Sequence, residues 1–261
     1  MSIRGSRLFS FFVAVILFGL YTLTAPRNHS EAEDGYDFAL KVEQGGFSDQ
    51  AGVNRVLALP AFNAAYAAAR VVGYTGRAFP FMIFINRLLA VVSLFLFWRL
   101  LGGMTSSSSA GDEEDAPRGA SRVDQLIPML CLAFSYGFWR YANAAETDIL
   151  ASVFVLGAWG LVFKQSAVSN QRSALGLQLL AVGCSAAGCL VHLLNLIPLL
   201  LIIPLYYLLS KEWKKALLHG GLTGGLVLAG YAICSPRLGF SELGAQHHGL
   251  EAGITCSNLL R

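Results

Sequence analysis

Charged side chains are scarce in this sequence. Only 13% of its 261 residues are Asp, Glu, Lys or Arg, whereas 55% are hydrophobic. Soluble domains carry about 25% charged residues, so the composition excludes an ordinary water-soluble domain and predicts a membrane protein with several spanning segments. The net charge of +3 indicates little about partners, because positive charge in such proteins mostly sets their orientation.

Several sequence motifs of known chemistry are also missing. The chain has no P-loop, no GxGxxG pattern and neither HExxH nor GxSxG, so we do not expect nucleotide-driven transport. No run of Lys and Arg interleaved with aromatic residues indicates nucleic-acid binding. The five cysteines include no CxxC pair, which argues against a metal site built on cysteine.

Apolar segments that approach the length of a bilayer recur along the chain. A spanning helix needs about 20 mostly apolar residues, with a range of roughly 17–25. The candidate segments are 8–24, 79–101, 126–141, 147–163, 175–191, 193–209 and 216–234. We therefore expect an all-α, polytopic membrane protein with about seven transmembrane helices, in which the two segments flanking His192 form a short hairpin.

Lys and Arg indicate which side of the membrane each loop faces, because short cytoplasmic loops are enriched in them. The basic residues that alternate with the segments are Arg4, Arg7, Arg118, Arg122, Lys164, Arg172, Lys211, Lys214 and Lys215. A cytoplasmic N-terminus places all of them on one side. The other side then receives loop 25–78, turn 140–146, the turn at His192 and tail 236–261. The expected location is the bacterial inner membrane or, in a eukaryote, the endoplasmic reticulum.

The first outer loop is predicted to be helical. Residues 34–44 have one apolar side, and Gly45-Gly46 ends that helix. Residues 54–72 have nearly helical apolar spacing, and Pro60 should kink that helix or lie close to its start. We expect both to be juxtamembrane helices that lie along the membrane. The Ser-rich and acidic loop 102–124 is instead typical of a flexible cytoplasmic linker.

Two acidic clusters lie beside predicted spans on the same outer side. They are Glu31, Glu33, Asp34 and Asp37 after the first segment, and Glu146 and Asp148 at the start of the fourth. Ionisable groups beside a bilayer are costly and tend to mark sites, so a carboxylate here is a candidate general base. The alternative is structural, with Asp34 and Asp37 capping one helix and the later pair meeting the dipole of another.

Other polar and aromatic residues lie close to the second cluster. Arg140 is placed to pair with Glu146 or to bind phosphate, whose oxygens match a guanidinium group. Trp139 is typical of the aromatic belt at a membrane surface. His192, at the outer end of the predicted hairpin, is either a hydrogen-bonded packing residue or part of the same cavity.

Two short motifs and the layout of the segments point to a known family. Residues 33–38 form an acidic motif after the first segment, and in residues 134–146 a Ser-x-x-Phe-Trp run leads into Ala-Glu. Together they resemble the GT-C superfamily of membrane glycosyltransferases, which includes protein O-mannosyltransferase-like enzymes and others that use lipid-linked sugars. The resemblance predicts a GT-C-like transmembrane module over residues 1–235.

The resemblance implies transfer of a sugar from a polyprenyl-phosphate donor to an unknown acceptor on the non-cytoplasmic face. It implies that Asp34 is the catalytic base with Asp37 in reserve, and that Glu146 orients the acceptor or helps to hold a divalent cation, Mg²⁺ or Mn²⁺. The sequence itself requires no metal. The substrate-binding residues that we expect are Arg140, Trp139, Arg55 and His192, with Arg70 as a further cation for the phosphate.

The sequence also departs from the family pattern. Residues 49–55 stand where a His-Pro-rich stretch often follows the acidic motif, and Thr147-Asp148 replaces a common Val/Ile-Tyr pair. The chain ends soon after the seventh segment, so a fragment, a minimal version and an inactive relative are open alternatives. The other function left open is a non-catalytic scaffold or lipid-carrier transport subunit, in which the acids cap helices and the arginines anchor the chain.

Overall fold

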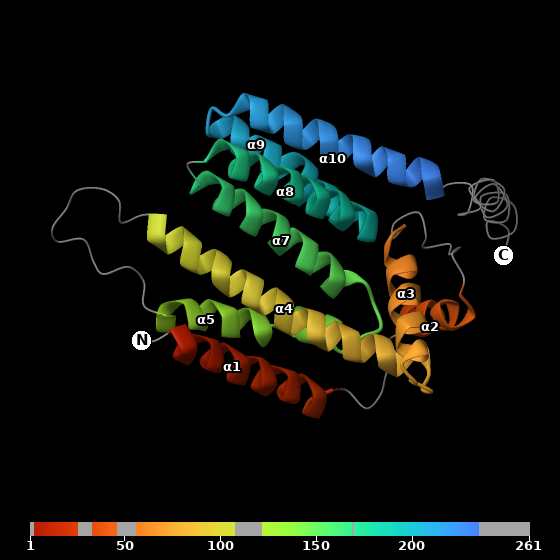
Figure 1. Ribbon diagram of the computed structural model, residues 1–261. Helices are drawn as coiled ribbons and strands as arrows, with labels where there is room; N and C mark the ends of the chain where they lie inside the picture. The colour runs from red at the N-terminus through yellow and green to blue at the C-terminus, as the bar shows by residue number, and fades with distance from the viewer. Residues whose placement is uncertain (1–2, 26–32, 46–55, 108–121, 169, 235–261) are drawn as a thin grey trace, which may run out of the picture.

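Helices make up every regular element in the part of the chain that the computed structural model describes, namely residues 3–25, 33–45, 56–107, 122–168 and 170–234 (Figure 1). Four helices are long and apolar enough to cross a membrane: α4 (Ala78–Ser107) over Ala78–Gly102, α7 (Asp148–Ser166), α8 (Gln171–Val191) and α10 (Trp213–Cys234) over Trp213–Ile233. Shorter apolar stretches are Phe11–Leu23, within α1 (Ile3–Leu23), and Leu193–Leu209. The all-α prediction is confirmed, and these helices indicate a membrane environment.

The long helices lie side by side, with α7 between α4 and α8, and α10 packed on α8 and α9 (Ile203–Leu209) (Figure 1). Large apolar side chains remain exposed on the array, among them Phe11 and Ile16 of α1, Leu180 of α8 and Leu228 of α10. Such exposure is costly in water but is what a lipid-facing surface requires. The lateral surface of the helix array is therefore suited to contact with lipid.

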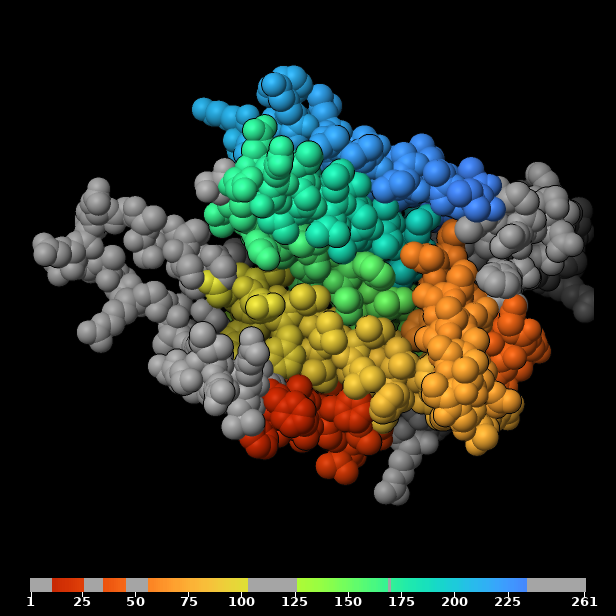
Figure 2. Space-filling model, viewed as in Figure 1, coloured from red at the N-terminus to blue at the C-terminus, as the bar shows by residue number. Residues whose placement is uncertain are grey.

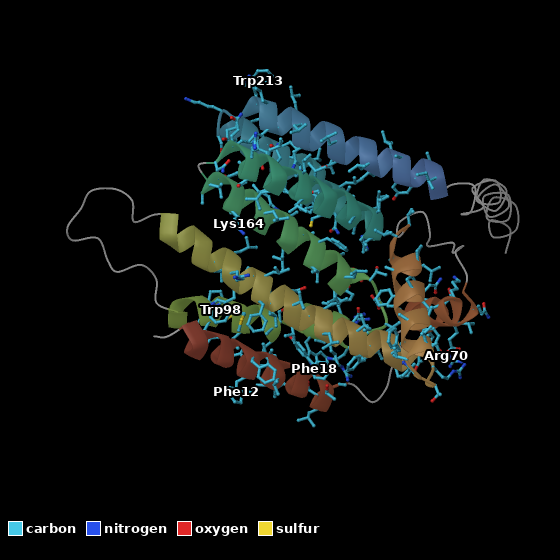
Figure 3. All side chains as sticks on the ribbon, viewed as in Figure 1. Phe12, Phe18, Arg70, Trp98, Lys164 and Trp213 are labelled. Atoms are coloured by element: carbon cyan, nitrogen blue, oxygen red, sulfur yellow. The ribbon has the colours of Figure 1, made fainter. Side chains whose placement is uncertain are left out.

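Two short helices, α2 (Glu33–Gln44) and α3 (Ala58–Val71), cover one end of the array beside the start of α4 (Figure 2). We call this the capped end, and it also contains the turn 143–147 and the end of α8. Arg70 lies at the capped end, whereas Lys164 and Trp213 lie at the opposite end (Figure 3).

The prediction that residues 34–44 and most of residues 54–72 are helical is confirmed. α2 ends at Gln44, and Gly45 follows with a φ of 65°, a left-handed conformation that glycine adopts without steric cost. α3 begins at Ala58, so Pro60 lies in its first turn, where a missing N–H costs least. Segment 102–124 is helical at both ends, because α4 continues to Ser107 and α5 (Arg122–Ala133) begins before Leu126. Residues 108–121 and the tail 236–261 lie outside the described part.

The third expected segment, 126–141, is two helices rather than one. α5 ends at Ala133, and α6 (Tyr136–Ala142) begins after Ser135, whose backbone is extended with a ψ of 137°. In the turn that we expected over residues 140–146, residues 140–142 belong to α6, and the non-helical turn covers residues 143–147. The break is held by α1, because the Tyr21 hydroxyl donates a hydrogen bond to the Ala133 carbonyl at 2.9 Å.

A buried polar chain joins four helices near the opposite end. The Tyr207 hydroxyl donates to Gln165 Oε1 at 2.6 Å, Gln165 Nε2 donates to Gln178 Oε1 at 3.2 Å, and Gln178 Nε2 donates to the Lys215 carbonyl at 3.1 Å. Buried amides are costly unless they are paired. Because each member has a partner on another helix, the chain aligns α7, α8, α9 and α10 along their length.

Glycine sets the spacing of α8 near the capped end. A Cβ atom on Gly188 would lie 2.7 Å from Leu199 Cδ1 and 3.1 Å from Phe154 Cβ. Leu199 belongs to a π-helix, η3 (Ile197–Ile202), and Phe154 to α7. Small residues allow helix backbones to approach closely within membranes, so Gly188 permits α8 to pack against both neighbours.

We predict that Gly188→Ala lowers the stability of the protein by about 1–3 kcal/mol, because the added methyl group overpacks this junction. Gly183→Ala is the matched control on the same helix, since its Cβ would meet no described atom within 4 Å. It should be neutral or stabilising by up to about 1 kcal/mol, because alanine favours helix more than glycine. Thermal unfolding of both variants in detergent measures the difference, and equal melting temperatures would contradict the prediction.

Candidate functional site

The turn 143–147 at the capped end is fixed by the side-chain amide of Asn86. Asn86 lies on α4 and is fully buried. Its Nδ2 donates to the Ala144 carbonyl at 2.6 Å and to the Glu146 carbonyl at 2.7 Å. Buried backbone groups outside helices must find other partners, and one amide supplies two of them here. Asn86 therefore sets where the second acidic cluster lies.

The neighbouring residue, Arg87, holds the beginning of the same turn. Its Nε donates to Asn143 Oδ1 at 2.9 Å, and its Nη1 lies 3.4 Å from Thr22 Oγ1 at the end of α1. Asn143 Nδ2 in turn donates to the Trp139 carbonyl at 3.0 Å. Our sequence reasoning missed both Asn86 and Arg87, although an Asn-Arg pair inside the apolar segment 79–101 was a signal that could have identified them.

The start of α2 packs against this turn. A Cβ atom on Gly35 would lie 3.5 Å from both Cβ and O of Ala145. The backbone that carries the first acidic cluster thus meets the turn that carries the second. Asp34 is the second residue of α2, so its backbone is placed beside the turn, but its side chain lies outside the described part, as does all of Arg55.

Asp37 has a different environment from the start of α2. Its Oδ2 lies 2.6 Å from Lys41 Nζ, one helical turn later, and its side chain is 59% exposed. Such a pair is ordinary surface support for a helix and contributes only a few tenths of a kcal/mol. Asp37 is the fifth residue of α2, so it supports the helix through this pair and not as a cap.

Asp148 and His192 face each other across the ends of α7 and α8. His192 Nε2 is 3.7 Å from Asp148 Oδ1, and the two side chains are 14% and 30% exposed. His192 Nδ1 accepts a hydrogen bond from the Leu194 N–H at 3.3 Å. The neutral imidazole therefore carries its proton on Nε2, toward the carboxylate. Both ring nitrogens are thus directed at partners, and the pair fixes the Asp148 carboxylate beside the end of α8.

The remaining predicted residues lie on α6. The Trp139 indole N–H donates to Thr24 Oγ1 at 2.9 Å, so its polar atom joins α6 to the end of α1. Arg140 is exposed on the same helix, and Glu146 is partly buried in the turn. Among the described residues, no three His, Cys, Asp or Glu side chains gather to hold a metal ion.

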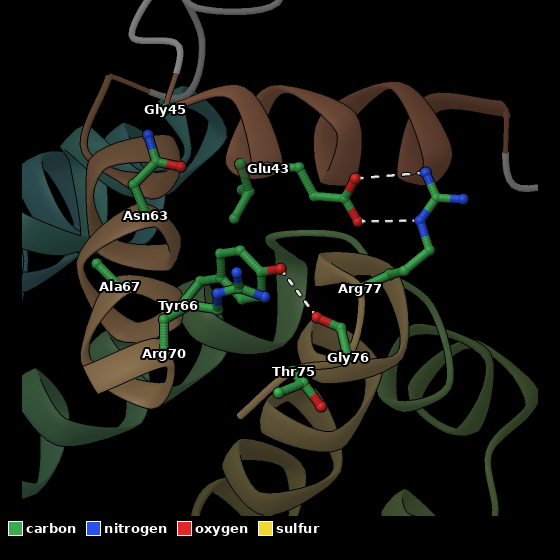
Figure 4. A pocket seen from close by; sticks show the side chains of 10 residues that line it. Glu43, Gly45, Asn63, Tyr66, Ala67, Arg70, Thr75, Gly76 and Arg77 are labelled. Atoms are coloured by element: carbon green, nitrogen blue, oxygen red, sulfur yellow. Dashed lines mark hydrogen bonds and ion pairs between the residues drawn. The ribbon is translucent and has the colours of Figure 1, made fainter. Parts of the chain in front are cut away.

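Glu43, near the other end of α2, joins that helix to the start of α4. Its Oε1 accepts the Ala78 N–H at 2.8 Å, and its carboxylate lies 3.3 and 3.4 Å from Nε and Nη2 of Arg77 (Figure 4). The carboxylate thereby satisfies a free N–H at a helix start. The hydrogen bond from Ala78, followed by that from Arg77, lowers the pKa of Glu43. Sequence reasoning had read residues 34–44 only for their apolar side and missed this contact.

Comparisons with models of protein families, with curated proteins and with solved structures found no match. The resemblance to membrane glycosyltransferases therefore rests on the sequence alone.

We predict that Asn86→Leu destabilises the protein by about 1–3 kcal/mol, because two carbonyls of the turn lose their donor. Ser93→Ala is the control, since Ser93 is buried on the same helix and its hydroxyl has no hydrogen-bond partner among the described residues. That variant should unfold at or above the wild-type temperature. Thermal unfolding in detergent tests both variants. A larger decrease in melting temperature for Ser93→Ala than for Asn86→Leu would contradict the conclusion that Asn86 holds the turn.

We also predict that the contribution of Glu43 to stability depends on pH. The folded-state pKa lies below the ordinary value of 4.5, so the ionised carboxylate stabilises the fold above that pH and the effect is lost as pH falls through the lower folded-state value. Melting temperatures of wild type and Glu43→Gln, compared from about pH 6 to about pH 3, should differ at the upper end and converge at the lower. Asp37→Asn, an exposed acid on the same helix, should keep the wild-type profile.

Proposed function

We propose that this protein transfers a sugar from a polyprenyl-phosphate donor to an acceptor on the non-cytoplasmic face of a membrane. The observation that carries the proposal is the junction at the capped end, where Gly35 meets Ala145 and Asp148 faces His192. Two elements far apart in the sequence thereby place acidic residues, or the backbone that bears them, at one end of an apolar helix array, and the end of α8 adds His192. A lipid-linked substrate requires a site at such a boundary.

The proposed chemistry needs a base and a leaving group. A carboxylate takes the proton of an acceptor hydroxyl, the acceptor oxygen bonds to C1 of the sugar, and the bond from C1 to the phosphate oxygen breaks. The lipid phosphate leaves with the electron pair. We propose Asp34 as the base, supported by the position of Gly35, and Asp148 as the residue that orients the acceptor, supported by its fixed partner His192. Glu146 and Arg140 stay candidates for contacts to acceptor and phosphate.

We propose a multi-pass topology of seven crossings with a cytoplasmic N-terminus. The support is that the helical elements follow the seven expected segments, with α5 and α6 together as the third. Lys164 and Trp213, near basic loops, lie at the end opposite to Arg70 and the capped end (Figure 3). The short loops that carry Lys and Arg thus share one end, as loops on the cytoplasmic side require.

The test measures transfer of label from radiolabelled polyprenyl-phosphate hexoses by purified full-length protein in lipid nanodiscs. Asp34→Asn and Asp148→Asn should each lower the rate by about 100-fold or more, since general-base catalysis and its positioning contribute about 10²–10⁴-fold. Asp37→Asn should stay within a few-fold of wild type, because that carboxylate is exposed and paired with Lys41.

Unchanged thermal unfolding must first show that each variant is folded. Full activity in folded Asp34→Asn would overturn the assignment of the base. Donor binding without transfer by wild type, across all the hexoses, would overturn the catalytic proposal in favour of a scaffold or lipid-carrier subunit.

A further inference from the structure

A hollow of about 690 Å³ lies at the capped end between α2, α3 and the loop that precedes α4 (Figure 4). Its polar lining consists of Glu43, Asn63, Tyr66, Arg70, Thr75 and Arg77. Pockets of about 300–1,000 Å³ are the usual size for small ligands. The hollow is therefore larger than a free phosphate ion needs, and its volume suits a phosphate group attached to a small organic moiety.

The walls of the hollow are held by aromatic packing. The Tyr66 hydroxyl donates to the Gly76 carbonyl at 2.9 Å, and the Tyr66 ring packs at 5.6 Å from Phe81 and 6.2 Å from Tyr74 between ring centroids. Gly73, with a φ of 96°, turns the chain from α3 into the loop. The loop is thus fixed to α3 and α4.

The charges that line the hollow favour an anion. Two arginines face one carboxylate, and Arg77 is already engaged with that carboxylate, Glu43. The Arg70 carbonyl accepts the Gly73 N–H, but its guanidinium makes no hydrogen bond or ion pair with any residue that the structure describes, although its charge acts on Glu43 at longer range. A guanidinium group without a bonded partner presents a planar fork of donors that matches phosphate oxygens.

Further hydrogen-bond donors lie beside Arg70. The backbone N–H groups of Thr75, Gly76 and Arg77 have no partner among the described residues, and the Thr75 hydroxyl lines the hollow. Phosphate oxygens accept several hydrogen bonds at once, whereas the one carboxylate in the lining, that of Glu43, is already engaged by Arg77. The chemistry of the lining therefore selects a phosphate group.

The position of the hollow indicates where that phosphate comes from. Arg77 immediately precedes the apolar stretch Ala78–Gly102, so the hollow lies where α4 would enter the bilayer, at the level of lipid headgroups. We propose that this hollow binds the phosphate-bearing headgroup of a membrane lipid, with Arg70 as its principal ligand. The site is separate from the Asp148–His192 junction and does not rest on the proposed sugar transfer.

The test is equilibrium binding to purified full-length protein in neutral detergent, with dioctanoyl phosphatidic acid and inorganic phosphate as the two probes. Arg70→Gln should weaken binding of the lipid probe about tenfold or more, because a charge-assisted bond is lost. Arg70→Lys should lose part of the affinity for the lipid probe, because lysine keeps the positive charge but cannot donate two parallel hydrogen bonds as a guanidinium does. Arg99→Gln, which removes an exposed arginine from the far half of α4, is the matched control and should bind like wild type.

Each outcome decides the proposal. Saturable binding of phosphatidic acid that inorganic phosphate displaces only at much higher concentration supports a lipid headgroup. Equal affinity for the two probes supports the phosphate site but assigns it to free phosphate and overturns the lipid source. Absence of saturable binding by wild type, or equal losses in Arg70→Gln and Arg99→Gln, overturns the site itself. Because no sugar transfer is measured, failure here leaves the proposed function untouched.

Discussion

The hydrogen bonds of one buried amide hold the capped end together. Turn 143–147 leaves helical structure yet lies against the core, and Asn86 supplies the donors that its Ala144 and Glu146 carbonyls would otherwise lack. The position of Ala145 against Gly35, and the entry of Asp148 into α7, both follow from that turn. An apolar residue in place of Asn86 would leave two carbonyls unpaired in a poorly hydrated environment, where each costs far more than in water. The backbone positions of the two acidic clusters would then no longer be fixed relative to each other.

The second constraint is how closely α8 approaches its neighbours. Gly188 lies one turn before His192, and its missing side chain leaves room for Phe154 of α7 and Leu199 of η3. The separation of Asp148 and His192 depends on that approach, because each residue stands at the end of one of these two helices. At the other end the buried chain from Tyr207 through Gln165 and Gln178 prevents sliding. Packing in the apolar middle thus determines the geometry of a polar site at its edge.

Sequence patterns could predict elements but not partners. Apolar run length located the long helices, and Gly45 marked the end of α2, because both signals are local. Asp148 and His192 were each singled out from the sequence, yet their pairing arises only when α7 packs on α8. The break at Ser135 was missed because the apolar run continues through it and the hydroxyl that stabilises the break belongs to Tyr21, 112 residues away from Ala133. Long-range polar contacts of this kind leave no local signal.

The two ends of α2 border different parts of the capped end, and the length of the helix keeps these parts apart. Gly35 meets the turn, whereas Glu43 borders the hollow, and eight residues of helix span about 12 Å. A phosphate that leaves during sugar transfer must lie within a few ångströms of the reacting acceptor, because reacting atoms approach to about 3–3.5 Å. The hollow and the turn are therefore two separate places along α2 at the capped end. If both proposals hold, the capped end binds two phosphate-bearing molecules at once, and the lipid beside Arg70 anchors α2 and α3 over the membrane surface while the donor reacts beneath the start of α2.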